Sequence, residues 1–219
     1  MTTLNVRRVA VQTPVLAKND ARAAVNRGLF HDLGIVAINL ISSPGSGKTT
    51  LLEAMAKELG DKMAVIEGDQ QTHRDAQRVR AAGCRAVQIE TGDACHLDAE
   101  AVSRAMDQLE LSGSPVRVVV IENVGNLICP SGYDLGENLK AAILSLPEGD
   151  DKVLKYPSIF SRIGALIINK MDLAPYMDFD VERAIQETRS INNHFETFQL
   201  SAKTGQGVPQ FCDYLRNGG

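Results

Sequence analysis

The stretch Ser42–Thr50 has the residue types and spacing that bind phosphate groups. Its small residues allow backbone N–H groups to converge on phosphate oxygens, and a helix start adds a positive dipole end. Lys48 supplies charge for the outer phosphates and for catalysis, while the Thr49 hydroxyl can ligate Mg²⁺. The common motif G-x-x-x-x-G-K-S/T begins with glycine, where this chain has Ser42. The residues expected to hold the nucleotide here are Gly45, Ser46, Gly47, Lys48, Thr49 and Thr50.

The pattern of the flanking residues supports this interpretation over a chance Gly-Lys-Thr at a helix start. An apolar run at 35–41 indicates a buried strand, and a helical pattern with Leu51, Leu52 and Met55 on one side begins at Lys48. Strand, glycine-rich turn and helix are the context that a phosphate-binding loop requires. The chain is therefore predicted to bind a nucleoside triphosphate.

A second motif, Asn169-Lys170-Met171-Asp172, predicts that the base is guanine. The Asp172 carboxylate can accept hydrogen bonds from N1–H and the exocyclic amine of guanine, donors that adenine lacks on that edge. A site built on such bonds rejects the analogue without them by about 10⁴ or more. The Lys170 stem can lie over the base, and Asn169 can join this loop to its neighbours. A backing loop is expected from Ser201, Ala202 and Lys203, so the predicted ligands are GTP and GDP.

Acidic residues after two other predicted strands are candidates for Mg²⁺ and for the attacking water. Glu122, in Glu-Asn-Val-Gly, stands where many GTPases carry the acid of D-x-x-G, whose glycine senses the γ-phosphate. Asp69 ends the strand at 62–67 and is the other candidate magnesium ligand beside Thr49. Asp75 is a candidate for orienting water, the alternative being a solvated acid at a helix start.

Cysteine and histidine residues indicate a second site for a softer metal. Cys95 and His96 are adjacent, and Cys129 follows the Glu122–Gly125 loop by a few positions. Thiolate and imidazole suit Ni²⁺ or Zn²⁺, and a shift of that loop on hydrolysis would move Cys129. The alternative is that these cysteines are buried and inert. Cys84 and Cys212 lack such neighbours and are expected to be structural.

Strand and helix patterns alternate along the chain. Strands are predicted at 35–41, 62–67, 85–90, 116–121, 141–146, 165–168 and 197–200, and helices at 16–33, from 48, at 74–82, 96–109, 181–189 and 208–215. Such alternation predicts an α/β fold with a doubly wound, mostly parallel sheet, whose ligands bind at the carboxyl ends of the strands. We expect a tail and short helix at 1–33 and a phosphate-loop GTPase domain at 34–219.

Composition excludes several classes of function. The net charge of -4, without a long basic block, argues against nucleic acid as a partner. No apolar run approaches the roughly 18 residues of a membrane span. Four cysteines are too few for a disulfide framework in 219 residues, so a reducing cytoplasm is expected.

Together these motifs resemble the HypB family of nickel-incorporation GTPases, which belongs to the dimerising (SIMIBI) class of phosphate-loop GTPases and serves the maturation of nickel–iron hydrogenases. The resemblance covers the chain from about residue 16 and is carried by SSPGSGKTT, IEGDQQT, TGDACHLDA, IENVGNLICP, EGDDKVLKYP, NKMDLAPY and the 201–203 loop. The combination of CHLDA with ENVGNLICP is the most specific part. This family itself uses a Ser-Ser-Pro loop, so Ser42 is no defect.

The resemblance implies a GTP-favoured homodimer in which Cys95, His96 and Cys129 of two subunits form a nickel or zinc site. Slow hydrolysis then releases nickel to the hydrogenase large-subunit precursor with help from the metallochaperone HypA. The segment at 148–157 is expected at the dimer interface, with Lys155 reaching the partner's nucleotide. The chain departs from many family members in having no cysteine before Cys84, so tight nickel storage is not expected.

Two other functions remain open on the sequence. A GTPase chaperone for another metalloenzyme, such as urease, would share the enzyme chemistry; however, urease-type chains carry Cys-Pro-His, whereas Ser131 follows Cys129-Pro130 here. A small-molecule or ATP-dependent kinase would share the phosphate loop, but Asp172 disfavours adenine.

Overall fold

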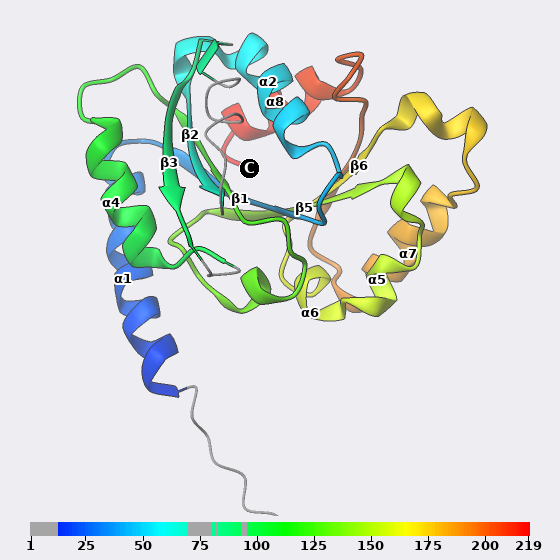
Figure 1. Ribbon diagram of the computed structural model, residues 1–219, viewed down its shortest axis with the longest axis horizontal. Coiled ribbons are helices and arrows are strands. Elements are labelled where there is room, and N and C mark those ends of the chain that lie inside the picture. Colours follow the sequence, from blue (N-terminus) through cyan, green and yellow to red (C-terminus); the bar gives the residue numbers. More distant parts are fainter. Residues whose placement is uncertain (1–12, 70–79, 82, 93–95) are drawn as a thin grey trace, which may run out of the picture.

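The computed structural model describes residues 13–69, 80, 81, 83–92 and 96–219. In this part of the chain, seven parallel strands form one sheet in the order β3-β2-β4-β1-β5-β6-β7 (Figure 1). The predicted doubly wound parallel sheet is thereby confirmed. The strands are β1 (Val36–Ser42), β2 (Met63–Asp69), β3 (Arg85–Glu90), β4 (Val118–Glu122), β5 (Leu139–Ser145), β6 (Ala165–Asn169) and β7 (Glu196–Gln199).

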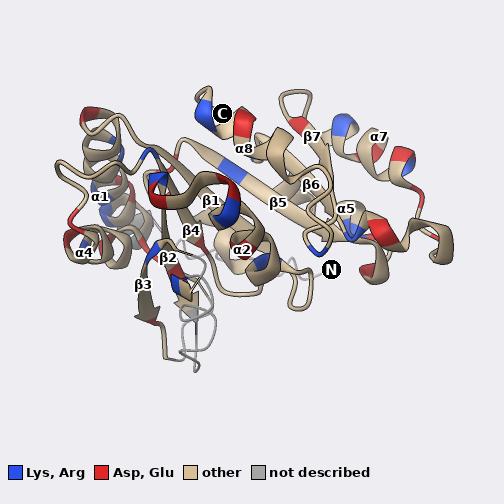
Figure 2. Cartoon of the chain, turned by 90° about the horizontal axis from the view of Figure 1, so that it is seen from above, with Lys and Arg blue, Asp and Glu red and all other residues tan. Residues whose placement is uncertain are grey.

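Helices cover both faces of this sheet. The helices among the described residues are α1 (Thr13–Asp32), α2 (Lys48–Leu59), α4 (Ala99–Leu109), α5 (Lys152–Lys155), α6 (Pro157–Phe160), α7 (Val181–Ile191) and α8 (Val208–Arg216). Short 3₁₀ helices occupy Gly60–Lys62, Cys129–Gly132, Leu146–Glu148 and Met171–Tyr176. Charged residues lie mainly on the helices and loops around the sheet (Figure 2). None of the described helices is long and apolar enough to cross a membrane.

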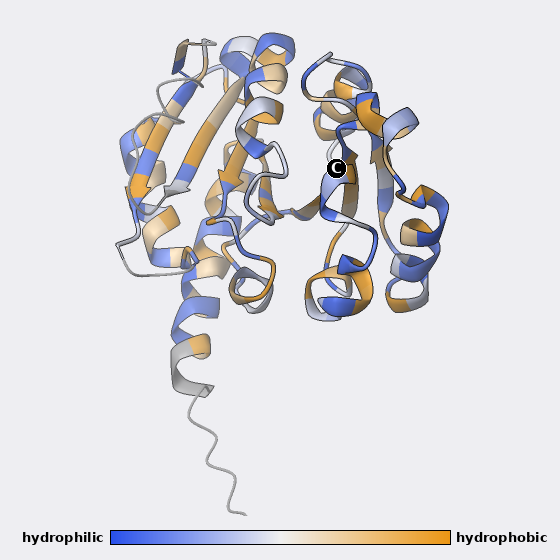
Figure 3. Cartoon of the chain, turned by 45° about the vertical axis from the view of Figure 1, so that its right-hand side comes forward, coloured by the Kyte–Doolittle hydropathy of each residue, from blue (hydrophilic) through white to orange (hydrophobic). Residues whose placement is uncertain are grey.

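The core forms because successive strand residues point to opposite faces. Ile38 and Leu40 of β1 belong to an apolar cluster with α2 and α8. Ala37 belongs instead to a cluster with α1 and α4, and Ile41 to one with α5, α6 and α7. The hydrophobic residues of the strands therefore lie between two helical layers (Figure 3).

Parallel strands bring their carboxyl ends to one edge, where ligands of such folds bind. Ser42 ends β1, Asp69 ends β2, Glu122 ends β4 and Asn169 ends β6. In the register of the sheet, Glu122 lies opposite Leu40 of β1 and Glu67 of β2. Polar residues far apart in the sequence are thus gathered at the edge that the strand pattern predicts.

Some boundaries differ from those predicted from the sequence. The helix expected from His96 begins at Ala99, because the Asp98 carboxylate accepts a hydrogen bond from Ala101 N at 2.7 Å and caps it. The short helices α5 and α6 were not expected, and the helix at 74–82 lies largely outside the described residues. The division at residue 33 stays a prediction, although Phe30 of α1 is fully buried against the sheet.

The cap of α7 provides a test of the fold. Asp180 Oδ1 accepts a hydrogen bond from Arg183 N at 2.9 Å, so Asp180→Ala should lower the free energy of unfolding by about 1 kcal/mol. Urea unfolding followed by circular dichroism measures the change. Asp178→Ala removes a nearby exposed acid and should leave stability almost unchanged; equal losses for the two variants would contradict the cap.

Candidate functional site

The turn between β1 and α2 is shaped by two glycines. Gly45 and Gly47 have φ angles of +76° and +96°, a region that glycine adopts without strain. A Cβ atom on Gly47 would lie 2.6 Å from Asn169 Nδ2, and that amide donates to Ser46 O at 2.9 Å. The absence of a side chain at Gly47 therefore allows the end of β6 to bond directly to the turn.

Ser42, at the position where the common motif has glycine, has a definite role in the turn. Its buried hydroxyl accepts hydrogen bonds from Lys48 Nζ at 2.9 Å and from Ser46 Oγ at 2.6 Å, and it donates to Ser43 O. The serine thus holds the lysine ammonium group against the turn. This contact is a physical reason for the serine, which the motif alone does not supply.

The loop after β6 is built from side chains that bond to two neighbouring segments. Asn169 Oδ1 accepts from Lys170 N and from Ala202 N, the latter at 3.0 Å. Lys170 has φ +65° and donates from Nζ to Gly45 O at 2.7 Å. Ser201 Oγ donates to Asp172 Oδ1 at 2.6 Å, which orients the carboxylate. Lys203 is exposed. The bond from Lys170 to Gly45 O brings the predicted base loop and the predicted phosphate loop together.

A cavity of about 550 Å³ lies at this edge of the sheet. It combines the glycine turn, the ends of β2 and β4, and the base loop. Its lining residues are Pro44, Gly45, Ser46, Gly47, Lys48, Thr49, Thr50, Glu67, Gly68, Glu122, Asn123, Val124, Gly125 and Lys170. It therefore contains all six predicted phosphate-loop residues and Glu122.

Glu67 is a candidate magnesium ligand that the sequence analysis did not identify. It is only 3% exposed, lines the cavity and is the β2 partner of Glu122, which is 6% exposed. Carboxylate and hydroxyl oxygens are hard ligands, so these two acids and Thr49 fit Mg²⁺. The signal was available, since Glu67 ends the predicted apolar strand at 62–67. The side chain of Asp69 and all of Asp75 lie outside the described residues, and their roles stay predictions.

His96 and Cys129, two of the predicted soft-metal residues, lie on neighbouring segments. The His96 ring lies 3.9 Å from the Tyr133 ring, between centroids, at a tilt of 34°. Burial lowers the pKa of His96, which favours the neutral imidazole that metals bind. Cys129 is partly exposed and begins the 3₁₀ helix that leads to Tyr133. Tyr133 thus joins the two segments.

The three-residue metal site itself stays a prediction. Cys95 lies outside the described residues, and among those described no group of three histidine, cysteine or acidic side chains could hold a metal ion. The donor chemistry of His96 and Cys129 nevertheless fits Ni²⁺ or Zn²⁺. Cys84 and Cys212 are buried, as expected of structural cysteines, whereas Cys129 is partly exposed.

The segment containing His96 is bonded to the cavity through Asn123. Leu97 N donates to Asn123 Oδ1 at 3.2 Å, Val124 N donates to the same oxygen, and Asn123 Nδ2 donates to Asn39 Oδ1 at 3.2 Å. Packing adds a second connection, because a Cβ on Gly68 would lie 2.8 Å from Leu97 Cγ. The residue next to His96 therefore contacts two residues that line the cavity.

A parallel sheet with this glycine turn and an Asn-Lys-x-Asp loop at one edge defines a phosphate-loop nucleotide-binding protein. Residues 36–199 match the family described as CobW/HypB/UreG, nucleotide-binding domain. The chain belongs to this family, in its HypB branch, which confirms the resemblance drawn from the motifs.

Three comparisons illustrate the relationship. The chain is 49% identical over 211 residues to hydrogenase maturation factor HypB of Azotobacter chroococcum mcd 1, covering 95% of this chain and 68% of that protein. It is 41% identical over 214 residues to hydrogenase/urease maturation factor HypB of Helicobacter pylori, covering 97% and 88%. It is similar to the crystal structure of HypB from Helicobacter pylori in complex with nickel, with TM-score 0.86, 42% identity and coverage of 91% and 94%.

The three described cysteines should differ in reactivity. Burial raises the pKa of Cys84 to about 11 and that of Cys212 to about 12, so both remain thiols at about pH 8. Iodoacetamide should therefore modify partly exposed Cys129 in the native chain and spare the other two, as measured by peptide mass mapping. In urea, Cys84 and Cys212 should be modified too; their rapid modification in the native chain would contradict their burial.

Proposed function

We propose that this chain is a GTPase that binds nickel or zinc and delivers nickel during hydrogenase maturation, with its nucleotide state controlling the metal. The observation that carries this proposal is the position of Asn123. Asn123 lines the cavity beside the phosphate loop, and its side-chain amide oxygen accepts a hydrogen bond from the backbone N–H of Leu97, next to His96. A change at the γ-phosphate would thereby reach the metal-binding segment directly.

Guanine specificity is supported by the arrangement of the base loop. Ser201 Oγ fixes one oxygen of Asp172, and Asn169 and Ala202 N hold the loop to the backing segment. A carboxylate fixed in this way is prepared to accept two hydrogen bonds from guanine. An adenine nucleotide would leave this acceptor without donors, which disfavours the kinase alternative.

Hydrolysis is assigned to the residues around the cavity. Lys48, held by Ser42, would stabilise charge on the outer phosphates, and the proposed magnesium ligands are Thr49, Glu122 and Asp69, with Glu67 as a further candidate. Mg²⁺ would neutralise charge between the phosphates when bound. Asp75 is the proposed water-orienting residue, and turnover is expected to be slow on the basis of the family resemblance.

Nickel or zinc is proposed to bind Cys95, His96 and Cys129 at the interface of a homodimer that GTP favours. The solved relative from Helicobacter pylori was crystallised in complex with nickel, which supports nickel as the cargo. Exposed Ile128, beside Cys129, supplies apolar surface to such an interface. Release would pass nickel to the hydrogenase large-subunit precursor, with a HypA-type metallochaperone as partner, in the cytoplasm.

A second client, urease, is supported by one observation. The Helicobacter pylori relative is named a hydrogenase/urease maturation factor, so its nickel chemistry serves two enzymes. Ser131 after Cys129-Pro130 favours the hydrogenase client for this chain. Nickel content of urease and hydrogenase precursors incubated with the loaded chain would distinguish them.

The guanine assignment predicts a change of base preference. Asp172→Asn replaces an acceptor of two hydrogen bonds by an amide that can donate to the C2 carbonyl of xanthine. GTP affinity should fall by about 10² or more, and XTP affinity should rise, in fluorescent-nucleotide competition. Asp178→Asn, at an exposed acid beyond the loop, should leave both affinities unchanged. Undiminished GTP preference in Asp172→Asn would remove the guanine assignment.

Coupling between the two sites predicts that the affinity for Ni²⁺ differs between the GDP complex and the complex with a slowly hydrolysed GTP analogue. Asn123→Ala breaks the bond to Leu97 N, and linkage between two sites needs a physical connection. The ratio of the two Ni²⁺ affinities should therefore fall at least tenfold in this variant, or fall to one if the wild-type ratio is below ten. Chelator competition measures Ni²⁺ affinity, and nucleotide affinity is measured in parallel.

Ser190→Ala, on the exposed surface of α7, serves as the control and should retain the wild-type difference. Equal Ni²⁺ affinity in both nucleotide complexes of the wild type would contradict nucleotide control of the metal. If the wild-type difference in Ni²⁺ affinity survives in Asn123→Ala, the route through Asn123 is contradicted, but nucleotide control of the metal is not.

A further inference from the structure

Helix α1 carries two buried asparagines on one face. Asn26 is fully buried and Asn19 is 8% exposed, and they are separated by about two helical turns. Burying a side-chain amide costs free energy unless hydrogen bonds replace those to water. Their positions within a helix therefore call for partners outside it.

Those partners are backbone groups of the two segments that contain the predicted metal ligands. Asn26 Nδ2 donates to Ala99 O at 2.8 Å and to Leu135 O at 3.0 Å. Asn19 accepts from Ala99 N at 3.0 Å and donates from Nδ2 to Asp134 O at 2.8 Å. Each asparagine thus bridges the start of α4 to the loop that precedes β5.

Close packing reinforces this bridge. Gly136 has φ +91°, and a Cβ there would lie 2.6 Å from Ala23 O, so only glycine lets the loop approach α1 this closely. Arg27 Nη2 contacts both carboxylate oxygens of Asp134, at 2.7 and 2.8 Å. The loop is therefore held to α1 by backbone and side-chain bonds together.

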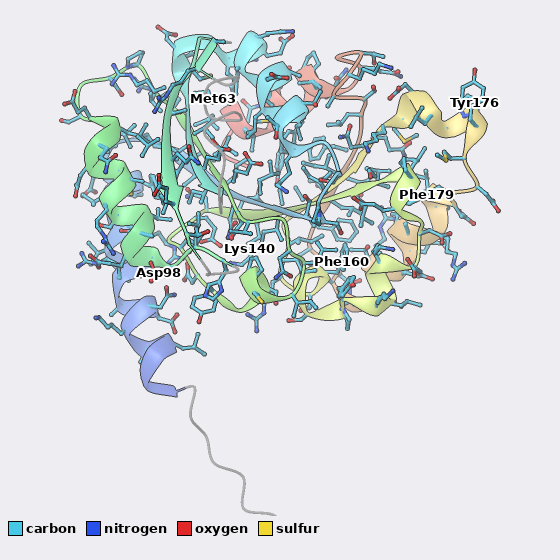
Figure 4. The ribbon with its side chains drawn as sticks, viewed as in Figure 1. Met63, Asp98, Lys140, Phe160, Tyr176 and Phe179 are labelled. Atoms are coloured by element: carbon cyan, nitrogen blue, oxygen red, sulfur yellow. The ribbon has the colours of Figure 1, made fainter. Side chains whose placement is uncertain are left out.

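Both bridged segments lead directly to the predicted metal ligands. Ala99 follows His96 by three positions, and Asp134 follows Cys129 by five. Tyr133, immediately before the bridged carbonyl of Asp134, stacks on the His96 ring. Asp98 lies at the end of α4 that adjoins α1 (Figure 4). The separation between the two segments therefore depends on α1.

We propose that Asn19 and Asn26 are positioning residues for the nickel site, and that α1 is a brace that fixes the distance between its two segments. This inference rests on the proposed metal function. It assigns a role to residues that lie before the 36–199 region matched by the family. The two asparagines do not line the nucleotide cavity, and their amides bond to backbone groups of Ala99, Asp134 and Leu135, through which they would act.

Two α1 variants test the brace with Ni²⁺ alone as the probe. Asn26→Ala removes both of its bonds, whereas Asn19→Asp keeps an acceptor for Ala99 N and loses the bond to Asp134 O. Loss of a partner that orients metal ligands commonly costs 10–100-fold in affinity, so each variant should bind Ni²⁺ about tenfold more weakly. Chelator competition and the nickel–thiolate absorption band supply the readouts.

The control is Ser114→Ala. Ser114 Oγ also donates to a backbone carbonyl, that of Leu111, and accepts from Val116 N, but it precedes β4 and so lies at the end of the sheet opposite the metal segments. It should lower the melting temperature as the α1 variants do, yet retain wild-type Ni²⁺ affinity. GDP affinity should stay within about twofold in all three variants, which shows that the sheet edge is intact.

The outcomes separate the brace from the function on which it rests. A wild-type chain without a nickel–thiolate band would contradict the proposed metal site. A wild-type band, with unchanged Ni²⁺ affinity in Asn26→Ala and Asn19→Asp, would overturn the brace alone. If Asn26→Ala does not fold, the Ni²⁺ affinity of Asn19→Asp alone is the test, and an unchanged affinity overturns the brace.

Discussion

The contact between Asn169 and the glycine turn is the constraint on which the cavity depends. Gly47 has no side chain, so the Asn169 amide reaches Ser46 O, while Lys170 binds Gly45 O from the same loop. Two loops separated by more than a hundred residues thereby become one rigid unit. Because the contact needs a positive φ at Gly47 and an amide at the end of β6, any larger residue at position 47 would separate the predicted phosphate and base sites.

Buried amides also form hydrogen bonds that connect the strands beside the cavity to each other and to the segment of His96. Asn123 connects the end of β4 to β1 through Asn39 and to the segment of His96 through Leu97. Asn39 in turn donates to Glu137, which also pairs with Lys140 at the start of β5. Such amides are costly to bury unless all partners are in place, so they favour a single arrangement of strands and loops. The nucleotide cavity and the proposed metal segments therefore share one polar framework.

Much of this architecture could be predicted from the sequence, for identifiable physical reasons. The apolar run of Val116–Ile121 and the turn at Ser42–Gly47 are local signals, because burial and backbone geometry are encoded within a few residues. Contacts such as Asn26 to Ala99 and Leu135 were not predictable, since they depend on how distant elements pack. Glu67 was missed because it is the last residue of the strand predicted at 62–67, whereas Asp69, two residues farther on, stands where a ligand beyond the strand end is expected. The predicted helix start at His96 precedes the true start at Ala99, because the Asp98 side chain caps the helix.

The hydrogen bond from Lys48 to Ser42 affects the entropy that is lost when a phosphate group binds. A free lysine side chain loses up to about 2 kcal/mol of rotational entropy when it is immobilised. In this chain the ammonium group is already restrained at 2.9 Å from a buried hydroxyl, so part of that loss occurs during folding. A glycine in place of Ser42 would leave the lysine to be ordered by each arriving phosphate group. The serine thus shifts an entropic cost from every binding event to a single event, the folding of the chain.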